Sequence, residues 1–307
     1  ELAPEDFETV GALTNVCARI VLKVLYQALH QRPDILWSVN ALARDVTRWN
    51  VACDKRLHRL ICYLHHHRDY VMTCFVGDTP ENCVLLLFVD ASFAGDLRDS
   101  KSTTGSVLCL AGPNTFVPIC WMCKKQGPVS HSSSEAEVIA LDTGLRIDGI
   151  PALDLWEDVI ETFCPKPQIE SGRRLSAVVN VHDNSLYSFL SNVDYVEPSL
   201  PPPSGRAKII LLEDNEPVIK MTIKRRSPHL RDVTRTHRVD LDWLFNRINE
   251  DPGISIRYWP TTLQIADILT KGQFTSMQWK FLCSLMQLGP STARGVKDKH
   301  HHHHVRT

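Results

Sequence analysis

The chain lacks several features that would define its class at once. Its longest apolar runs, such as residues 84–89, are too short to span a bilayer, so no membrane association is expected. The first residues do not combine a basic segment, a long apolar core and a small-residue cleavage site. The ten cysteines show no regular spacing that would indicate a disulfide framework. Together these absences predict an intracellular protein kept under reducing conditions.

An excess of charge of one sign is also missing. The sequence has 34 Lys and Arg against 35 Asp and Glu, a net charge of -1, so binding to nucleic acid would rely on local basic clusters. The candidate clusters are Lys124-Lys125, Arg173-Arg174 and Lys224-Arg225-Arg226. Short basic runs are more often solvated surface. With 43% hydrophobic and 22% charged residues, the 307-residue chain has the composition of a folded protein rather than a disordered one.

Two histidine and cysteine patterns suggest metal binding but lack the necessary partners. Cys120 and Cys123 form a Cys-x-x-Cys pair without a second pair at zinc-site spacing, and they fall in a predicted strand. We interpret this spacing as coincidence. The histidines at 65–67 are interpreted as a solvated helix end, and the run at 300–304 resembles a purification tag. Neither run enters the functional interpretation.

Apolar periodicity divides the chain into three parts. Residues 1–80 carry apolar side chains at spacings of three and four, which predicts two or three packed helices. Residues 81–285 predict an α/β domain, within which the proline-containing segment 164–207 is an irregular insertion. Residues 286–307 are predicted to form a disordered tail.

The second part reads as a mixed five-stranded sheet flanked by helices. The continuous apolar run at 84–89 is typical of a strand covered on both faces, and two further strands follow it as an antiparallel meander. The predicted strands are residues 84–89, 106–110, 116–122, 208–215 and 254–259. The predicted helices are residues 132–146, which begin with a serine-rich capping pattern, then 151–163, 216–224, 239–249 and a last one from about 262.

Four acids lie in four separate predicted elements. Asp90 and Asp214 end two strands, Glu137 lies near the start of the serine-rich helix, and Asp267 lies in the last helix. Carboxylates that converge from separate elements are how two-metal phosphodiesterases hold a pair of divalent ions about 4 Å apart. Hard oxygen ligands favour Mg²⁺ or Mn²⁺ over zinc. Any one of these acids alone is more simply explained as a helix cap.

The residues around these acids resemble successive blocks of the ribonuclease H domain of copia-like long-terminal-repeat retrotransposons. The blocks follow the family's order at residues 89–96, 100–105, 121–126, 132–141, 213–215, 236–240 and 266–271. Seven blocks in the same order over about 180 residues are far more specific than any single one. The resemblance implies an RNase H-like α/β fold.

The resemblance also implies the roles of individual residues. It assigns the two Mg²⁺ or Mn²⁺ ions and the catalysis to Asp90, Glu137, Asp214 and Asp267. Glu135 and Asp183 are the alternatives to Glu137 and Asp214. Glu137 is preferred because residues 136–141 match the family's Ala-Glu-x-x-Ala-Leu, and Asp214 because a stronger apolar run precedes it and its spacing to the His237 block fits.

The implied substrate contacts are Ser134, Lys124, Lys125, Asn215 and His237. His237 is either a general acid or substrate contact, or a satisfied histidine at a helix start.

The first part of the chain is similar to the end of the family's reverse transcriptase, the connection that joins polymerase to nuclease. Residues 11–13, 32–35, 39–44 and 57–64 carry this similarity, while the polymerase signature Tyr-x-Asp-Asp is absent, so the chain itself is not expected to synthesise DNA. The histidines at 65–67 and the length of the insertion depart from the family pattern. The resemblance implies a segment of a Pol polyprotein, with the upstream reverse transcriptase as its partner.

The function implied is hydrolysis of the RNA strand of RNA–DNA hybrids, in a cytoplasmic virus-like particle or in the nucleus. A second hypothesis is an inactive nucleic-acid-binding or structural remnant of a retroelement that keeps the same fold. An integrase or transposase of the same superfamily is less favoured, because these enzymes use three acids at a different spacing and usually carry an amino-terminal zinc motif. The sequence carries no signal of oligomeric state.

Overall fold

The computed structural model describes residues 2–96, 98–164, 205–225, 230 and 233–291. Most of the predicted insertion lies outside these residues, as do Arg173, Arg174, Asp183 and Arg226. The histidine run at 300–304 lies outside them as well. Among the described helices, none combines the length and apolar character needed to cross a bilayer.

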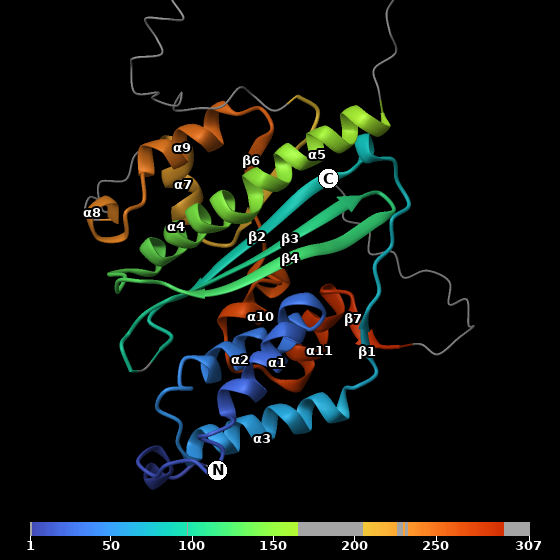
Figure 1. Ribbon diagram of the computed structural model, residues 1–307. Helices are drawn as coiled ribbons and strands as arrows, with labels where there is room; N and C mark the ends of the chain where they lie inside the picture. Colours follow the sequence, from blue (N-terminus) through green and yellow to red (C-terminus); the bar gives the residue numbers. More distant parts are fainter. Residues whose placement is uncertain (1, 97, 165–204, 226–229, 231–232, 292–307) are drawn as a thin grey trace, which may run out of the picture.

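A five-stranded mixed sheet forms the centre of the fold, as predicted (Figure 1). Its strands are β2 (Val84–Ser92), β3 (Thr103–Gly112), β4 (Thr115–Lys125), β5 (Ile209–Glu213) and β6 (Ile254–Tyr258). The order across the sheet is β4-β3-β2-β5-β6. The first three strands form an antiparallel meander, whereas β5 runs parallel to β2 and β6 parallel to β5. This arrangement is consistent with an RNase H-like fold.

Helices cover both faces of the sheet (Figure 1). One face carries α4 (Ser133–Gly144), α5 (Ile150–Phe163), α7 (Glu216–Lys224), α8 (Val233–His237) and α9 (Leu241–Glu250). The other side carries α1 (Cys17–His30), α2 (Leu36–Ala43), α3 (Val51–His66), α10 (Asp267–Thr270) and α11 (Ser276–Leu285). Each side has its own hydrophobic cluster against the sheet.

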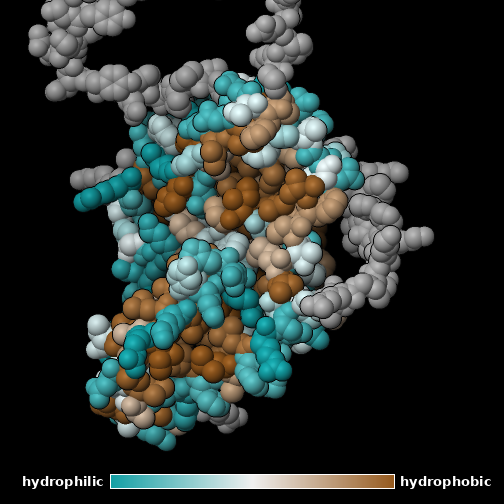
Figure 2. Space-filling view, turned by 45° about the vertical axis from the view of Figure 1, so that its right-hand side comes forward, coloured by the Kyte–Doolittle hydropathy of each residue, from teal (hydrophilic) through white to brown (hydrophobic). Residues whose placement is uncertain are grey.

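The predicted boundary at residue 80 does not separate two cores. Leu36 and Val39 of α2 belong to one cluster with Phe88 and Val107 of the sheet and Ile268 of α10. The first helices therefore pack as one layer with the last ones. Apolar side chains such as Leu22 and Leu29 of α1 remain exposed, and Figure 2 shows apolar residues reaching the surface of this lower helical layer.

Two further predictions of local structure need correction. The sheet-facing helix does not break between residues 146 and 151, because a π-helical turn, Leu145–Gly149, joins α4 to α5 and accommodates Pro151 in the first turn of α5. The predicted disordered tail begins too early at 286. Met286 is fully buried, and β7 (Leu288–Pro290) pairs antiparallel with β1 (Tyr70–Met72).

The short helix α10 is fastened to the ends of the central strands. The side-chain amide of Gln264 donates to the carbonyl of Val89 at 2.9 Å and to that of Leu212 at 3.3 Å, so it bridges β2 and β5. The Thr270 hydroxyl donates to the Asp90 carboxylate. Gly105 lies opposite Asp90 on β3, and a Cβ atom there would lie 2.6 Å from Thr270 Cγ2 and 3.0 Å from the Ala266 carbonyl oxygen. Glycine at this position thus lets α10 approach Asp90.

We predict that Gly105→Ala lowers the free energy of unfolding by about 1–3 kcal/mol, because the added methyl group overpacks the contact with α10. Gly127→Ala is the matched control, since a Cβ atom at Gly127 meets nothing within 4 Å. Urea denaturation of both variants measures the difference. Equal free energies of unfolding in the two variants would contradict the packing described here.

Candidate active site

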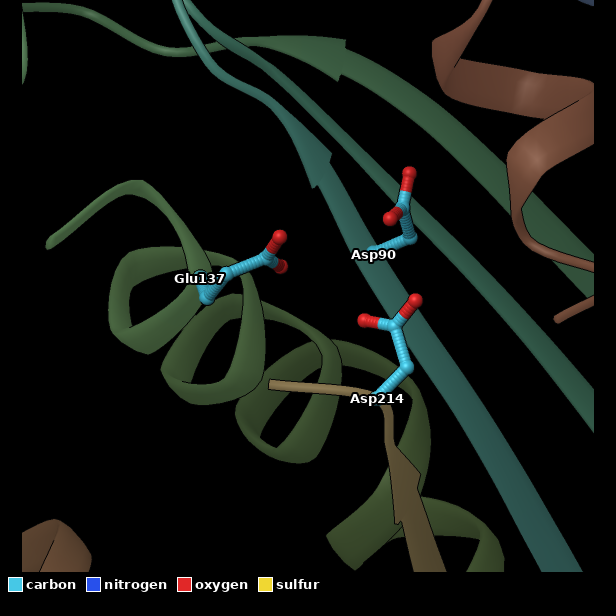
Figure 3. A group of neighbouring side chains, drawn as sticks. All are labelled: Asp90, Glu137 and Asp214. Carbon is cyan, nitrogen blue, oxygen red and sulfur yellow. The ribbon is translucent and has the colours of Figure 1, made fainter. Parts of the chain in front are cut away.

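Three carboxylates meet at one edge of the sheet (Figure 3). Asp90 lies near the carboxyl end of β2, and Asp214 directly follows the last residue of β5. These strands are parallel neighbours, so their carboxyl ends share an edge, which is where open α/β sheets bind ligands. Glu137 points toward the two aspartates from α4 (Figure 3). One carboxylate oxygen from each of the three residues lies within 4.8 Å of the others.

The start of α4 determines which glutamate faces this edge. The Ser132 hydroxyl accepts a hydrogen bond from the Glu135 N–H at 3.1 Å, so Ser132 caps the helix as its sequence pattern predicts. Glu135 and Glu137 are two positions apart and therefore leave an α-helix in nearly opposite directions. Glu135 accepts from the His131 N–H and contacts His237, whereas Glu137 turns toward Asp90 and Asp214. This geometry supports Glu137 over Glu135.

A fifth acid, which the sequence interpretation did not single out, lies beneath the site. Glu213 ends β5 and is completely buried. It alternates with Ile209 and Leu211, which belong to the core on the α4 side of the sheet. Its Oε1 accepts from the Asn215 N–H at 3.1 Å. The alternation of side chains along the strand could have placed Glu213 on the same side as Ile209 and Leu211. It does not predict whether an acid at the end of the strand is buried.

Burial and mutual repulsion disfavour the ionised forms of these acids. Burial raises the pKa of Asp90, Glu137 and Glu213, and the negative charges of the neighbouring acids raise each pKa further. Within the described part of the chain, Glu137 Oε2 and Glu213 Oε2 are buried without a hydrogen-bond partner. Converging hard oxygen donors that repel one another when ionised fit a divalent ion such as Mg²⁺ or Mn²⁺.

Asp267 lies beside the three-carboxylate group rather than within it. It begins α10, and its Oδ1 is 2.5 Å from Lys271 Nζ. The same ammonium nitrogen is 3.9 Å from Asp90 Oδ1. Burial, followed by the charge of Asp90, raises the pKa of Asp267 to about 7. The structure therefore brings all four predicted acids into one neighbourhood, with Asp267 bound to a lysine.

Some of the predicted substrate contacts are exposed, whereas others already pair with groups of the protein. Ser134 is half-buried at the start of α4, and Lys124 is exposed at the end of β4. The Lys125 ammonium is held 2.6 Å from both Asp96 and Asp99, so it is not a free cation. The Asn215 side chain accepts from the Val218 N–H at 3.3 Å and caps α7.

His237 is enclosed rather than presented to a substrate. Its side chain is 2% exposed, and its Nε2 lies 3.1 Å from Glu135 Oε1, although the two groups are not aligned for a hydrogen bond. This placement favours the interpretation of His237 as a structural histidine over a mobile general acid.

Among the described residues, the group of three or more possible metal ligands contains no residue of the cysteine and histidine patterns. Cys120 packs against the cluster on the α4 side of the sheet, whereas Cys123 packs against the cluster on the α2 side. The two thiols thus face opposite sides of β4, an arrangement that does not direct both of them at one ion. His65 and His66 are exposed at the end of α3, as expected for a solvated helix end.

Comparison with known proteins gives partial similarities. No protein-family model matches the chain. It is 28% identical over 141 residues, 46% of its length, to the retrovirus-related Pol polyprotein from transposon TNT 1-94 of Nicotiana tabacum, of which it covers 10%. It is 34% identical over 111 residues, 34% of its length, to the Pol polyprotein from transposon RE2 of Arabidopsis thaliana, of which it covers 7%. It is also 29% identical over 123 residues, 38% of its length, to secreted RxLR effector protein 161 of Plasmopara viticola, of which it covers 78%.

The chain thus spans a tenth or less of the length of the two polyproteins that it matches. The similarities support its interpretation as a region of a retrotransposon Pol polyprotein.

The raised pKa of Asp267 predicts how stability depends on pH in metal-free protein. Since this pKa rises from 3.8 to about 7 on folding, the stability that Asp267 contributes falls as pH rises across that window. Asp267→Asn removes the titration. In the presence of a chelator, the variant should be more stable than wild type at pH 8, by up to about 4 kcal/mol, and similar to it near pH 4.

Urea denaturation at the two pH values measures this effect. Asp99→Asn is the control, because hydrogen bonding to Lys125 lowers the pKa of Asp99 and its removal should give no gain at pH 8. A wild-type protein more stable than Asp267→Asn at pH 8 would contradict the electrostatic description.

Proposed function

We propose that this chain is the ribonuclease H region of a retrotransposon Pol polyprotein and hydrolyses the RNA strand of RNA–DNA hybrids with Mg²⁺ or Mn²⁺. The observation that carries the proposal is the convergence of Asp90, Glu137 and Asp214 within 4.8 Å at the carboxyl ends of two parallel strands. The RNase H-like sheet and the partial similarity to plant transposon polyproteins support it. The upstream reverse transcriptase of the same polyprotein is the proposed partner.

In this proposal the chain supplies a rigid set of oxygen ligands. Asp90, Glu137 and Asp214 would hold a divalent ion, and Asp267 would complete the ligands of a second one. When bound, such ions supply Lewis acidity and lower the pKa of water to generate a nucleophile. The protein's own part is to hold the carboxylates in place. Thr270 donates to Asp90, and a backbone hydrogen bond from Ala91 reaches Glu137.

The substrate is proposed from the chemistry of a double helix that contains RNA. Such duplexes present 2′-hydroxyl groups and phosphates along a wide minor groove, which proteins read by shape rather than by sequence. Exposed Lys124 and half-buried Ser134 are the predicted contacts that the structure leaves accessible. Because these contacts address the backbone, cleavage should be insensitive to sequence and weakened by salt.

Cleavage of a labelled RNA–DNA hybrid tests the proposal. Wild-type protein with Mg²⁺ or Mn²⁺ should cleave the RNA strand, and Asp90→Asn should reduce the rate by on the order of 100-fold or more, the effect of losing one preorganised electrostatic group. Glu250→Gln, at the exposed end of α9 where Glu250 pairs with Arg225, is the control and should cleave normally.

Two outcomes would reject parts of the proposal. Equal rates for wild type and Asp90→Asn would refute the site assignment. A folded wild-type protein that binds ions and hybrid but cleaves neither strand would favour the alternative, an inactive nucleic-acid-binding remnant of a retroelement.

A further inference from the structure

A lysine stands at the rim of the carboxylate site. Lys271 directly follows α10, and its side chain is 38% exposed. Its Nζ lies 2.5 Å from Asp267 Oδ1 and 3.9 Å from Asp90 Oδ1. The same short segment therefore brings a carboxylate and an ammonium group to the site.

We propose that Lys271 is a built-in counter-ion that competes with the second of two divalent ions. This inference rests on the proposed function and deepens it. The first ion would bind among Asp90, Glu137 and Asp214. Lys271 Nζ is 3.9 Å from Asp90 there, against 2.5 Å from Asp267, and within the described residues no salt bridge reaches Glu137 or Asp214. The second would need Asp90 and Asp267 and would bind only as Lys271 leaves Asp267. The two ions should then differ in affinity.

The packing decides which of the two partners can move. Asp267 cannot withdraw easily, because Ile268 and Leu269 beside it are completely buried and Gln264 anchors the segment to β2 and β5. Lys271, by contrast, ends in a flexible four-carbon stem with one third of its side chain in solvent. The ammonium group of Lys271, and not the Asp267 carboxylate, would therefore move away when the second ion binds.

A helix-stabilising salt bridge is the simpler explanation for the same contact. Pairs spaced four residues apart at exposed positions contribute little. Here α10 has only four residues, and the Asp267 side chain is 11% exposed. Asp267 and Lys271 thus lie beside the three-carboxylate group and not on the exposed surface of a long helix. The two explanations differ in what removal of the lysine does to ion binding.

Titration of the metal-free full chain with Mn²⁺, followed by calorimetry and by the electron paramagnetic resonance of free Mn²⁺, measures both binding steps. Wild type should bind a first ion and a second one at least tenfold more weakly. Lys271→Met should tighten the second step tenfold or more and change the first step less, whereas Lys271→Arg, which keeps the charge, should retain the weak second step. Lys55→Met is the matched control, because Lys55 of α3 also pairs with an aspartate, Asp6, at 2.6 Å, and Asp6 is not one of the four acids of the site.

The results separate this inference from the proposed function. Identical second-step affinities in Lys271→Met and Lys55→Met would refute the counter-ion role while leaving the nuclease proposal intact. Failure of wild type and every variant to bind Mn²⁺ would refute the metal site itself and the proposed function with it. Should Lys271→Met unfold, as judged by circular dichroism, Lys271→Gln replaces it with a polar side chain of similar length and the same expected result.

Discussion

The repulsion among buried carboxylates is the constraint on which the rest of this structure depends. Asp90, Glu137 and Glu213 are nearly or completely removed from solvent, and each raises the cost of ionising its neighbours. The hydrogen bonds from Thr270, Ala91 and Asn215 offset only part of this cost. Without a bound cation, the free energy that keeps these acids buried must come from the packing of the apolar cores.

Those cores explain why the amino-terminal helices and the site form one packed unit. The layer formed by α1, α2, α10 and α11 packs against one side of the sheet, and α4, α5, α7 and α9 pack against the other. Asp90 therefore lies on a strand covered from both sides, and α10 can carry Asp267 and Lys271 to it. Removing the first eighty residues would uncover Phe88 and Val107, so the helical layer is part of what supports the site.

Much of this arrangement could be predicted from the sequence where the signal is local. The apolar run before Asp90, the serine cap before Glu137 and the strand before Asp214 each indicate their element, and parallel pairing then brings their ends together. The engagement of Lys125 by Asp96 and Asp99, and of His237 by Glu135, depends on tertiary contacts that no local pattern contains. The three-residue strands β1 and β7 are too short to show a period, and they pair although Tyr70 and Pro290 lie far apart in the sequence.

The most direct test of the central claim is anomalous diffraction from crystals of the chain grown with Mn²⁺. A manganese peak is expected where carboxylate oxygens of Asp90, Glu137 and Asp214 coordinate it at about 2 Å, the distance that small hard cations adopt. A fully occupied manganese ion bound elsewhere, with these three carboxylates free of metal, would contradict it.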